Sequence, residues 1–191
     1  SCHPDSTVLG PRFLHRWITR DNVNDIFSEA DFTGEIDLLS LDMDGFDYWV
    51  FEAIEVIKPR VVILEFMPQL GLEPLTVPYS ENFETEWIPL FSRDDKTGEQ
   101  LDDETPEDLS FFGRWTMYGG ASLPAFNKLA KQKGYRLIGA NSIGFNAFFI
   151  RNDIANDLFP EVTEQSCFNE NARTRFDRAN AKVKGMDWER V

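Results

Sequence analysis

Two nearly continuous apolar segments, Ile36 to Leu41 and Arg60 to Phe66, constrain the fold of this chain more than any other feature. Such runs are typical of strands in a parallel sheet that is covered on both faces. Between them, apolar residues recur at helical spacing over residues 47–57, and Pro59 ends this expected helix. Strand, helix and strand within about 30 residues predict a right-handed βαβ unit, whose crossover is long enough to join parallel strands.

Three further helices and one hairpin are expected. The helices cover residues 22–30, 122–133 and 172–183, and the second has Ser122 at its N-cap. The hairpin joins two apolar runs, 135–140 and 146–151, through a turn-like segment.

The remaining sequence divides the chain into three parts. Residues 1–18 form an irregular N-terminal segment, residues 19–153 form the α/β domain, and residues 154–191 form a charged, partly helical tail. Inside the domain, residues from about 69 to 118 show no period and include a strongly acidic stretch. A loop of this length is usually a functional lid, although a solvated acidic loop is the alternative.

Charge and composition exclude several classes of function. The formal net charge of −14 makes nucleic acid an unfavourable partner. No apolar run approaches the roughly 20 residues that a membrane span requires, so no membrane insertion is expected. No signal peptide is visible, and Cys2 and Cys167 form no framework. These features favour a reducing compartment, the cytoplasm or an organelle interior, and leave one Cys2–Cys167 bridge open.

Carboxylates follow both strands of the βαβ unit. Asp42 and Asp44 come directly after the first strand, and Glu65 is near the end of the second. In open α/β sheets ligands bind outside the carboxyl ends of the strands. Three carboxylates there could bind a divalent metal, act as a general base, or hold a cationic or hydroxylated ligand. Alternatively, Asp42 or Asp44 caps the following helix and Glu65 pairs with an arginine.

Four segments, which cover 70 of the 191 residues, occur in this order: DNVNDIF, IDLLSLDMDGFDYWVFEAI, PRVVILEF and YGGASLPAFNKLAKQKGYRLIGANSIGFNAFFIRND. In them the chain resembles the C-terminal half of FkbM-type methyltransferases, a group of class I enzymes that use S-adenosylmethionine. The resemblance implies a partial Rossmann-like fold of the α/β class, with strands four to seven of a mostly parallel sheet and a closing antiparallel hairpin.

The same resemblance implies roles for individual residues. Asp42 and Asp44 would lie beside the cofactor, and Asp42 and Glu65 would be catalytic, Glu65 by holding or deprotonating an acceptor hydroxyl. The residues implied for substrate binding are Tyr118, Ser122, Asn141 and Asn146. For Ser122 a helix cap and for Asn141 a turn are the alternatives. Two roles are open for four of the tryptophans, stacking on a substrate or anchoring the core. They are Trp49, Trp87, Trp115 and Trp188.

The chain departs from this family in one respect, because no GxGxG loop precedes DNVNDIF, and Gly10 stands alone there. The implied function is O-methyl transfer to a small molecule or sugar, provided that a cofactor-binding half exists upstream. The alternative is a non-catalytic subunit of a larger assembly, with a protein as its partner and an oligomer or complex as its state. The DxDG motif also opens haloacid-dehalogenase phosphatases, in which the first aspartate is the nucleophile and the second is the acid/base. That family remains a third alternative.

Overall fold

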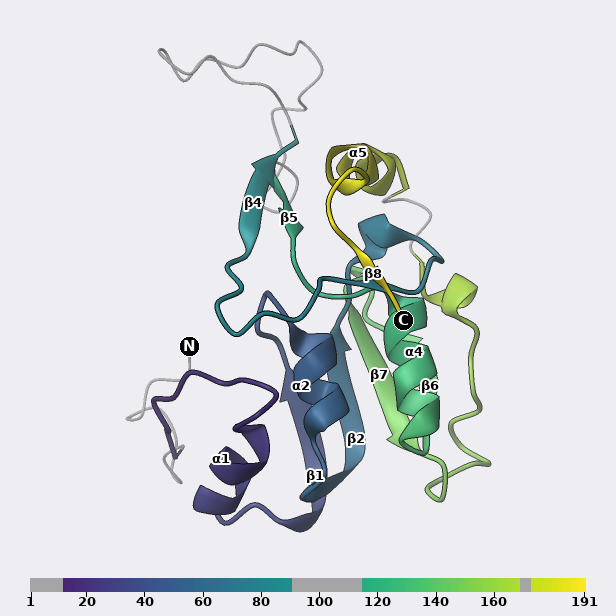
Figure 1. Cartoon of the computed structure of the whole chain (residues 1–191). Coiled ribbons are helices and arrows are strands. Elements are labelled where there is room, and N and C mark those ends of the chain that lie inside the picture. The colour runs from purple at the N-terminus through teal and green to yellow at the C-terminus, as the bar shows by residue number, and fades with distance from the viewer. Residues whose placement is uncertain (1–11, 91–114, 169–172) are drawn as a thin grey trace.

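The computed structural model describes residues 12–90, 115–168 and 173–191, and a four-stranded sheet lies at its centre (Figure 1). The strands have the order β1-β2-β7-β6 and comprise Gly34–Leu41, Ile57–Glu65, Asn146–Arg151 and Tyr135–Ala140. β1 and β2 are parallel, whereas β7 is antiparallel to both of its neighbours. The fold is therefore mixed α/β. The expectation of a mostly parallel sheet is wrong for these strands, because the hairpin supplies two of the four.

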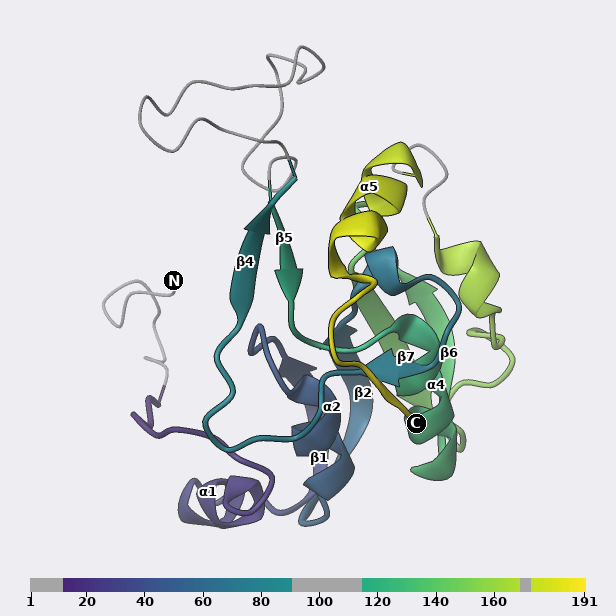
Figure 2. The ribbon, with the colours of Figure 1, turned by 45° about the horizontal axis from the view of Figure 1, so that its top comes forward.

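Two helices cover one face of this sheet. Helix α2, Asp47–Ala53, connects β1 to β2, and helix α4, Leu123–Gln132, precedes β6. Both lie in front of the sheet in Figures 1 and 2, and the short helix α1, Val23–Glu29, lies to one side. Beneath the two helices, Val62, Leu64 and Phe149 are fully buried. This face carries the core.

The opposite face of the sheet is only partly covered. Leu38 of β1 is 52% exposed, and Ile63 of β2 and Phe148 of β7 are half-buried. The apolar runs predicted strands buried on both faces. Among the described residues one face is fully buried, whereas the other is buried only in places, such as at Ile150. The apolar pattern of these strands therefore exceeds what this part of the chain covers.

Pro59 lies inside β2, and not at the end of a helix. Helix α2 stops at Ala53, four residues before the predicted end, and β2 begins at Ile57. Because β7 pairs only with residues 61–65, Pro59 has a neighbouring strand on one side alone, where a missing N–H is tolerated. Proline also favours the extended conformation in the residue before it, which suits a strand.

The segment predicted to be irregular, 69–118, contains short strands. The 3-10 helix η2, Pro68–Leu70, and strand β3, Leu75–Thr76, are followed by β4, Glu86–Pro89, and β5, Trp115–Tyr118. β4 and β5 form an antiparallel ladder that projects beyond the main sheet (Figure 1). Residues 91–114, which include most of the acidic stretch, lie outside the described residues.

The tail returns to the domain. After the 3-10 helix η3, Glu164–Cys167, helix α5, Arg173–Val183, lies near η2, and strand β8, Glu189–Arg190, pairs with β3. Cys167 is buried with a free thiol, and Cys2 lies outside the described residues. None of the described helices has the length and apolar character needed to cross a bilayer.

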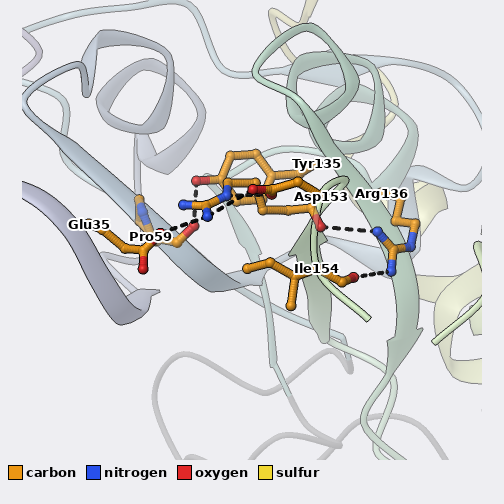
Figure 3. Close-up of polar contacts among 7 residues, drawn as sticks. Glu35, Pro59, Tyr135, Arg136, Asp153 and Ile154 are labelled. Atoms are coloured by element: carbon orange, nitrogen blue, oxygen red, sulfur yellow. Dashed lines mark hydrogen bonds and ion pairs between the residues drawn. The ribbon is translucent and has the colours of Figure 1, made fainter. Parts of the chain in front are cut away.

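Buried polar contacts tie the hairpin to the amino end of the sheet (Figure 3). The Tyr135 hydroxyl donates to the carbonyl of Pro59 at 2.7 Å. The buried Arg136 guanidinium donates to the carbonyls of Ile154 at 2.7 Å and Arg151 at 3.0 Å. A buried cation is stable only when its donors are satisfied, so this network fixes the end of the sheet opposite to Asp42 and Glu65.

Candidate functional site

Three carboxylates meet at the carboxyl ends of β1 and β2. Leu41 is paired with Leu64, which brings Asp42 next to Glu65, and Asp44 completes the group. One oxygen from each of the three side chains lies within 4.8 Å of the others. Oxygens that share one hard cation, each 2.0–2.6 Å from it, lie at most about 5 Å apart. The structure thus brings together the three carboxylates that the sequence placed at these strand ends, and their spacing fits a divalent cation as well as a proton.

The environment of Glu65 favours its neutral form. Burial, the negative charges of Asp42, Asp44 and Asp47, and a hydrogen bond with Asp42 together raise the pKa of Glu65 to about 8. Burial and then Asp42 also raise the pKa of Asp44. Within the described residues, no ion pair links Asp42, Asp44 or Glu65 to a basic side chain. The alternative in which Glu65 pairs with an arginine is therefore not seen there.

Hydrogen bonds to the Asp47 side chain stabilise the turn that carries Asp42 and Asp44. The Asp47 carboxylate is 2% exposed and accepts the N–H groups of Met43 at 2.9 Å and Gly45 at 3.2 Å. Asp44 has a φ of 53°, a left-handed conformation that is unusual outside glycine. The N-cap residue of α2 is Phe46, without a side-chain cap. The alternative that Asp42 or Asp44 caps α2 is thus wrong, because the N-cap residue is Phe46 and no side chain caps the helix.

Hydrogen bonds from the segments that precede β4 and α4 also hold the turn in place. The N–H of Gly120 donates to the Gly45 carbonyl at 2.5 Å, and the Thr85 hydroxyl donates to the Asp44 carbonyl. A Cβ atom on Gly119 would lie 3.0 Å from the same Asp44 carbonyl oxygen. A glycine at position 119 therefore allows the close approach that fixes Asp44 in place.

A pocket of about 90 Å³ opens beside the carboxylates. Asp44 and Glu65 form its polar wall. Trp87 and Trp115 lie on one face of the β4–β5 ladder, because Trp87 is opposite Met117 and Trp115 is two positions before Met117 on the same strand. Most of the other lining is apolar: Phe66, Met67, Pro68, Met117, Ile143 and Phe145. The pocket combines negative charge with aromatic surface.

Asn146 is the predicted substrate residue that lies nearest to this group. It is directly opposite Glu65 in the β2–β7 pairing, so the two side chains share one face of the sheet. Asn141 does not line the pocket and affects it only through the turn 141–146. Its Oδ1 accepts the N–H groups of Gly144, Phe145 and Asn146, and it thereby shapes the turn that borders the pocket.

Tyr118 and Ser122 lie outside the pocket lining. The Tyr118 hydroxyl donates to the Asp187 carbonyl, and its ring packs on Trp188 with 4.9 Å between centroids. Ser122 is fully buried, and its Oγ accepts the N–H of Ala125 at 3.2 Å, as a helix cap does. Trp49 also has a structural contact, since its indole donates to the Val77 carbonyl at 2.8 Å.

A larger cavity, of about 390 Å³, lies on the other side of the turn. It shares Met43 and Gly45 with the site and is otherwise lined mainly by the N-terminal segment, including Arg16 and Trp17, and by Phe83. None of the three carboxylates lines it, so its size alone does not make it the reactive centre.

Sequence reasoning missed Asp47 and Thr85. Asp47 was counted as the first residue of a helix, although a carboxylate two and four residues after N–H groups at a strand end is a recognisable turn signal. Thr85 belongs to a segment without periodicity, and its contact with Asp44 spans 41 positions. No local pattern could have indicated it.

No family model, no curated protein and no solved structure matches this chain. Its function is therefore argued from the site itself.

Proposed function

We propose that this chain forms the acceptor side of a Rossmann-like methyltransferase of the FkbM type and transfers a methyl group to a hydroxyl oxygen of a small molecule or sugar. One observation carries the proposal. Glu65 stands at the carboxyl edge of parallel strands, with a raised pKa, and opens into a pocket beside two aspartates.

The strand arrangement supports this proposal. In Rossmann order, strand four lies between strands one and five. If β1 and β2 correspond to strands four and five, the free edge of β1 is where strand one belongs. Among the described strands β1 pairs only with β2. The partly exposed face around Leu38 is then where the helices of the other half pack, because parallel sheets are covered on both faces.

The chemistry of the acceptor side follows from the carboxylates. Above pH 8 Glu65 is ionised and strongly basic for a carboxylate, so it can accept the proton of an acceptor hydroxyl as the oxygen gains its methyl group. Asp44 lies in the same pocket wall and can hold that hydroxyl in position. Bound S-adenosylmethionine would supply an electrophilic methyl group. This chain has no glycine-rich loop to hold the methionine end, so in the proposal it contributes only Asp42 and Asp44 beside the cofactor.

The metal-sized spacing of the three carboxylates favours one other candidate. A magnesium-dependent phosphatase would use Asp42 as nucleophile and Asp44 as acid/base. It predicts hydrolysis of a phosphate ester such as p-nitrophenyl phosphate in the presence of Mg²⁺, and complete loss of hydrolysis in Asp42→Asn. Hydrolysis that survives this substitution removes the candidate.

The free edge and the open face also fit a non-catalytic subunit whose sheet a partner completes. This reading predicts that native material is always found in a larger assembly. A free, active monomer would count against it.

Calorimetry of the full natural protein with S-adenosylmethionine tests the proposal directly. We expect saturable binding that weakens at least tenfold in Asp42→Asn. Asp37→Asn is the matched control, because Asp37 is also an aspartate of the β1 segment but is 96% exposed and lies away from the carboxyl edge. If the full natural protein does not bind the cofactor, the proposal is wrong.

A further inference from the structure

The pocket between β2 and the β4–β5 ladder carries negative charge that nothing described neutralises. Asp44 and Glu65 line it, Asp42 lies within 4.8 Å of both, and no basic side chain is part of the lining. A neutral ligand that covered these carboxylates would remove them from water without compensation, which is costly. A positively charged ligand would offset that cost.

Aromatic side chains face the same space. Trp87 and Trp115 line the pocket from one side of the β4–β5 ladder, and Phe66 and Phe145 contribute from the main sheet and its turn. Trp87 is 44% exposed, so part of its ring surface is accessible to a ligand. Indole faces attract cations, and organic ammonium groups are recognised by carboxylates together with aromatic rings.

The apolar lining distinguishes an organic cation from a metal ion. A hard cation takes oxygen ligands, and beyond the carboxylates most of this lining is aromatic, aliphatic or thioether, which a hard cation does not use. A substituted ammonium group offers N–H donors or a charged surface to the carboxylates and methylene groups to the rings. A volume of about 90 Å³ holds such a group and its immediate carbons, with the rest of the molecule outside.

We propose that the acceptor bound here carries an ammonium group, with Asp44 as its charge partner, Glu65 as a second oxygen acceptor, and Trp87 and Trp115 as its aromatic walls. An amino sugar combines such a group with hydroxyls. The identity of the reacting hydroxyl rests on the proposed methyl transfer, whereas the preference for a cation is a property of the pocket alone.

Competition between matched sugars tests the preference. Glucosamine and glucose differ at one position, an ammonium in place of a hydroxyl, and each is titrated into the protein at pH 7 while NMR shifts and tryptophan fluorescence are followed. MgCl₂ is titrated separately. We expect glucosamine to bind at least about tenfold more tightly than glucose, a difference of 1.4 kcal/mol. The double variant Asp44→Asn/Glu65→Gln should lose this preference, and Trp87→Leu should weaken glucosamine binding without changing the affinity for Mg²⁺. Asp37→Asn, on the outer part of β1, should behave like the wild type.

Each opposite result overturns the inference. Equal binding of both sugars, binding of Mg²⁺ alone, absence of binding by glucosamine, or a preference that survives the double variant would each show that the pocket does not select an organic cation. None of these titrations contains S-adenosylmethionine. The two proposals can therefore fail separately. Methyl transfer to a neutral acceptor alone would contradict the cation preference and leave the proposed function intact. A cation preference without methyl transfer would support the preference and contradict the proposed function.

Discussion

The carboxylate of Asp47 accepts the backbone N–H of Met43 at 2.9 Å and thereby closes the turn between Asp42 and Asp44. This buried contact links the start of α2 to the end of β1, so the geometry of the candidate site depends on a residue that does not line the pocket.

Replacing Asp47 should destabilise both the fold and the turn. Asp47→Ala leaves two N–H groups without their charged acceptor, and hydrogen bonds to charged groups contribute about 1.5–3 kcal/mol each. We expect a loss of about 2–4 kcal/mol in urea unfolding, and a smaller loss for Asp47→Asn. Asp25→Ala is the control, because Asp25 is exposed in the first turn of α1, and it should cost less than about 1 kcal/mol. Equal losses for Asp47→Ala and Asp25→Ala would contradict this role.

A methyl group at position 119 should push the turn out of place. The added Cβ of Gly119→Ala would lie 3.0 Å from the Asp44 carbonyl oxygen, so the backbone has to shift. We expect a loss of about 1–3 kcal/mol and altered amide shifts of Asp44 and Gly45 in NMR spectra. Gly185→Ala is the matched control, since nothing lies within 4 Å of its added Cβ. A stable Gly119→Ala protein with unchanged shifts would show that the close approach is unimportant.

Lys133 should stabilise the end of α2. Its ammonium donates to the carbonyls of Glu52 at 2.8 Å and Ile54 at 2.9 Å, the last carbonyls of that helix. Burial lowers the pKa of Lys133, so between this lowered pKa and the ordinary value of 10.5 the unfolded chain holds a proton that the folded protein has released, and the stability contributed by this group rises with pH. Lys133→Met should cost about 1.5–3 kcal/mol in thermal or urea unfolding. Lys128→Met is the control, because Lys128 is an exposed residue of α4, the helix that ends next to Lys133, and this variant should lose little stability. Equal losses of stability in Lys133→Met and Lys128→Met would show that the contacts of Lys133 with α2 do not stabilise the fold.

Glu65 should make the protein less stable as the pH rises. Its folded pKa of about 8 lies above its ordinary value of 4.5, so between these values the folded protein keeps a proton that the unfolded chain has released. The stability from this group is complete below pH 4.5 and is lost as the pH rises through about 8. The free energy of unfolding of Glu65→Gln, relative to that of the wild type, should therefore increase from pH 5 to pH 8 by about 1–2 kcal/mol after allowance for solvent screening. Glu55→Gln, an exposed carboxyl outside the cluster, should leave the pH profile unchanged. Parallel profiles for the wild type and Glu65→Gln would show that the pKa of Glu65 is not raised in the folded protein.

The sequence predicted the elements whose periodicity is complete. The βαβ unit, α4 with Ser122 as its cap, and the hairpin appear within a few residues of their expected bounds, because burial of one face sets the apolar spacing of each. The meeting of Asp42, Asp44 and Glu65 followed from the parallel pairing of β1 and β2.

Other features depend on contacts that no local pattern records. The β4–β5 ladder forms from segments separated by residues 91–114, and it brings Trp87 and Trp115 to the pocket. The exposure of Leu38 was not predictable either, since an apolar strand has the same sequence whether or not something covers its second face.

Methyl transfer by the full natural protein tests the central claim most directly. Labelled S-adenosylmethionine is supplied with hydroxyl acceptors, including glucosamine, and the rate is followed from pH 6 to pH 9 for the wild type, Glu65→Gln and Glu55→Gln. The proposed function predicts a wild-type rate that rises towards pH 8, a fall of about 100-fold or more in Glu65→Gln, and no change in Glu55→Gln. A Glu65→Gln enzyme that transfers methyl groups as fast as the wild type would contradict it.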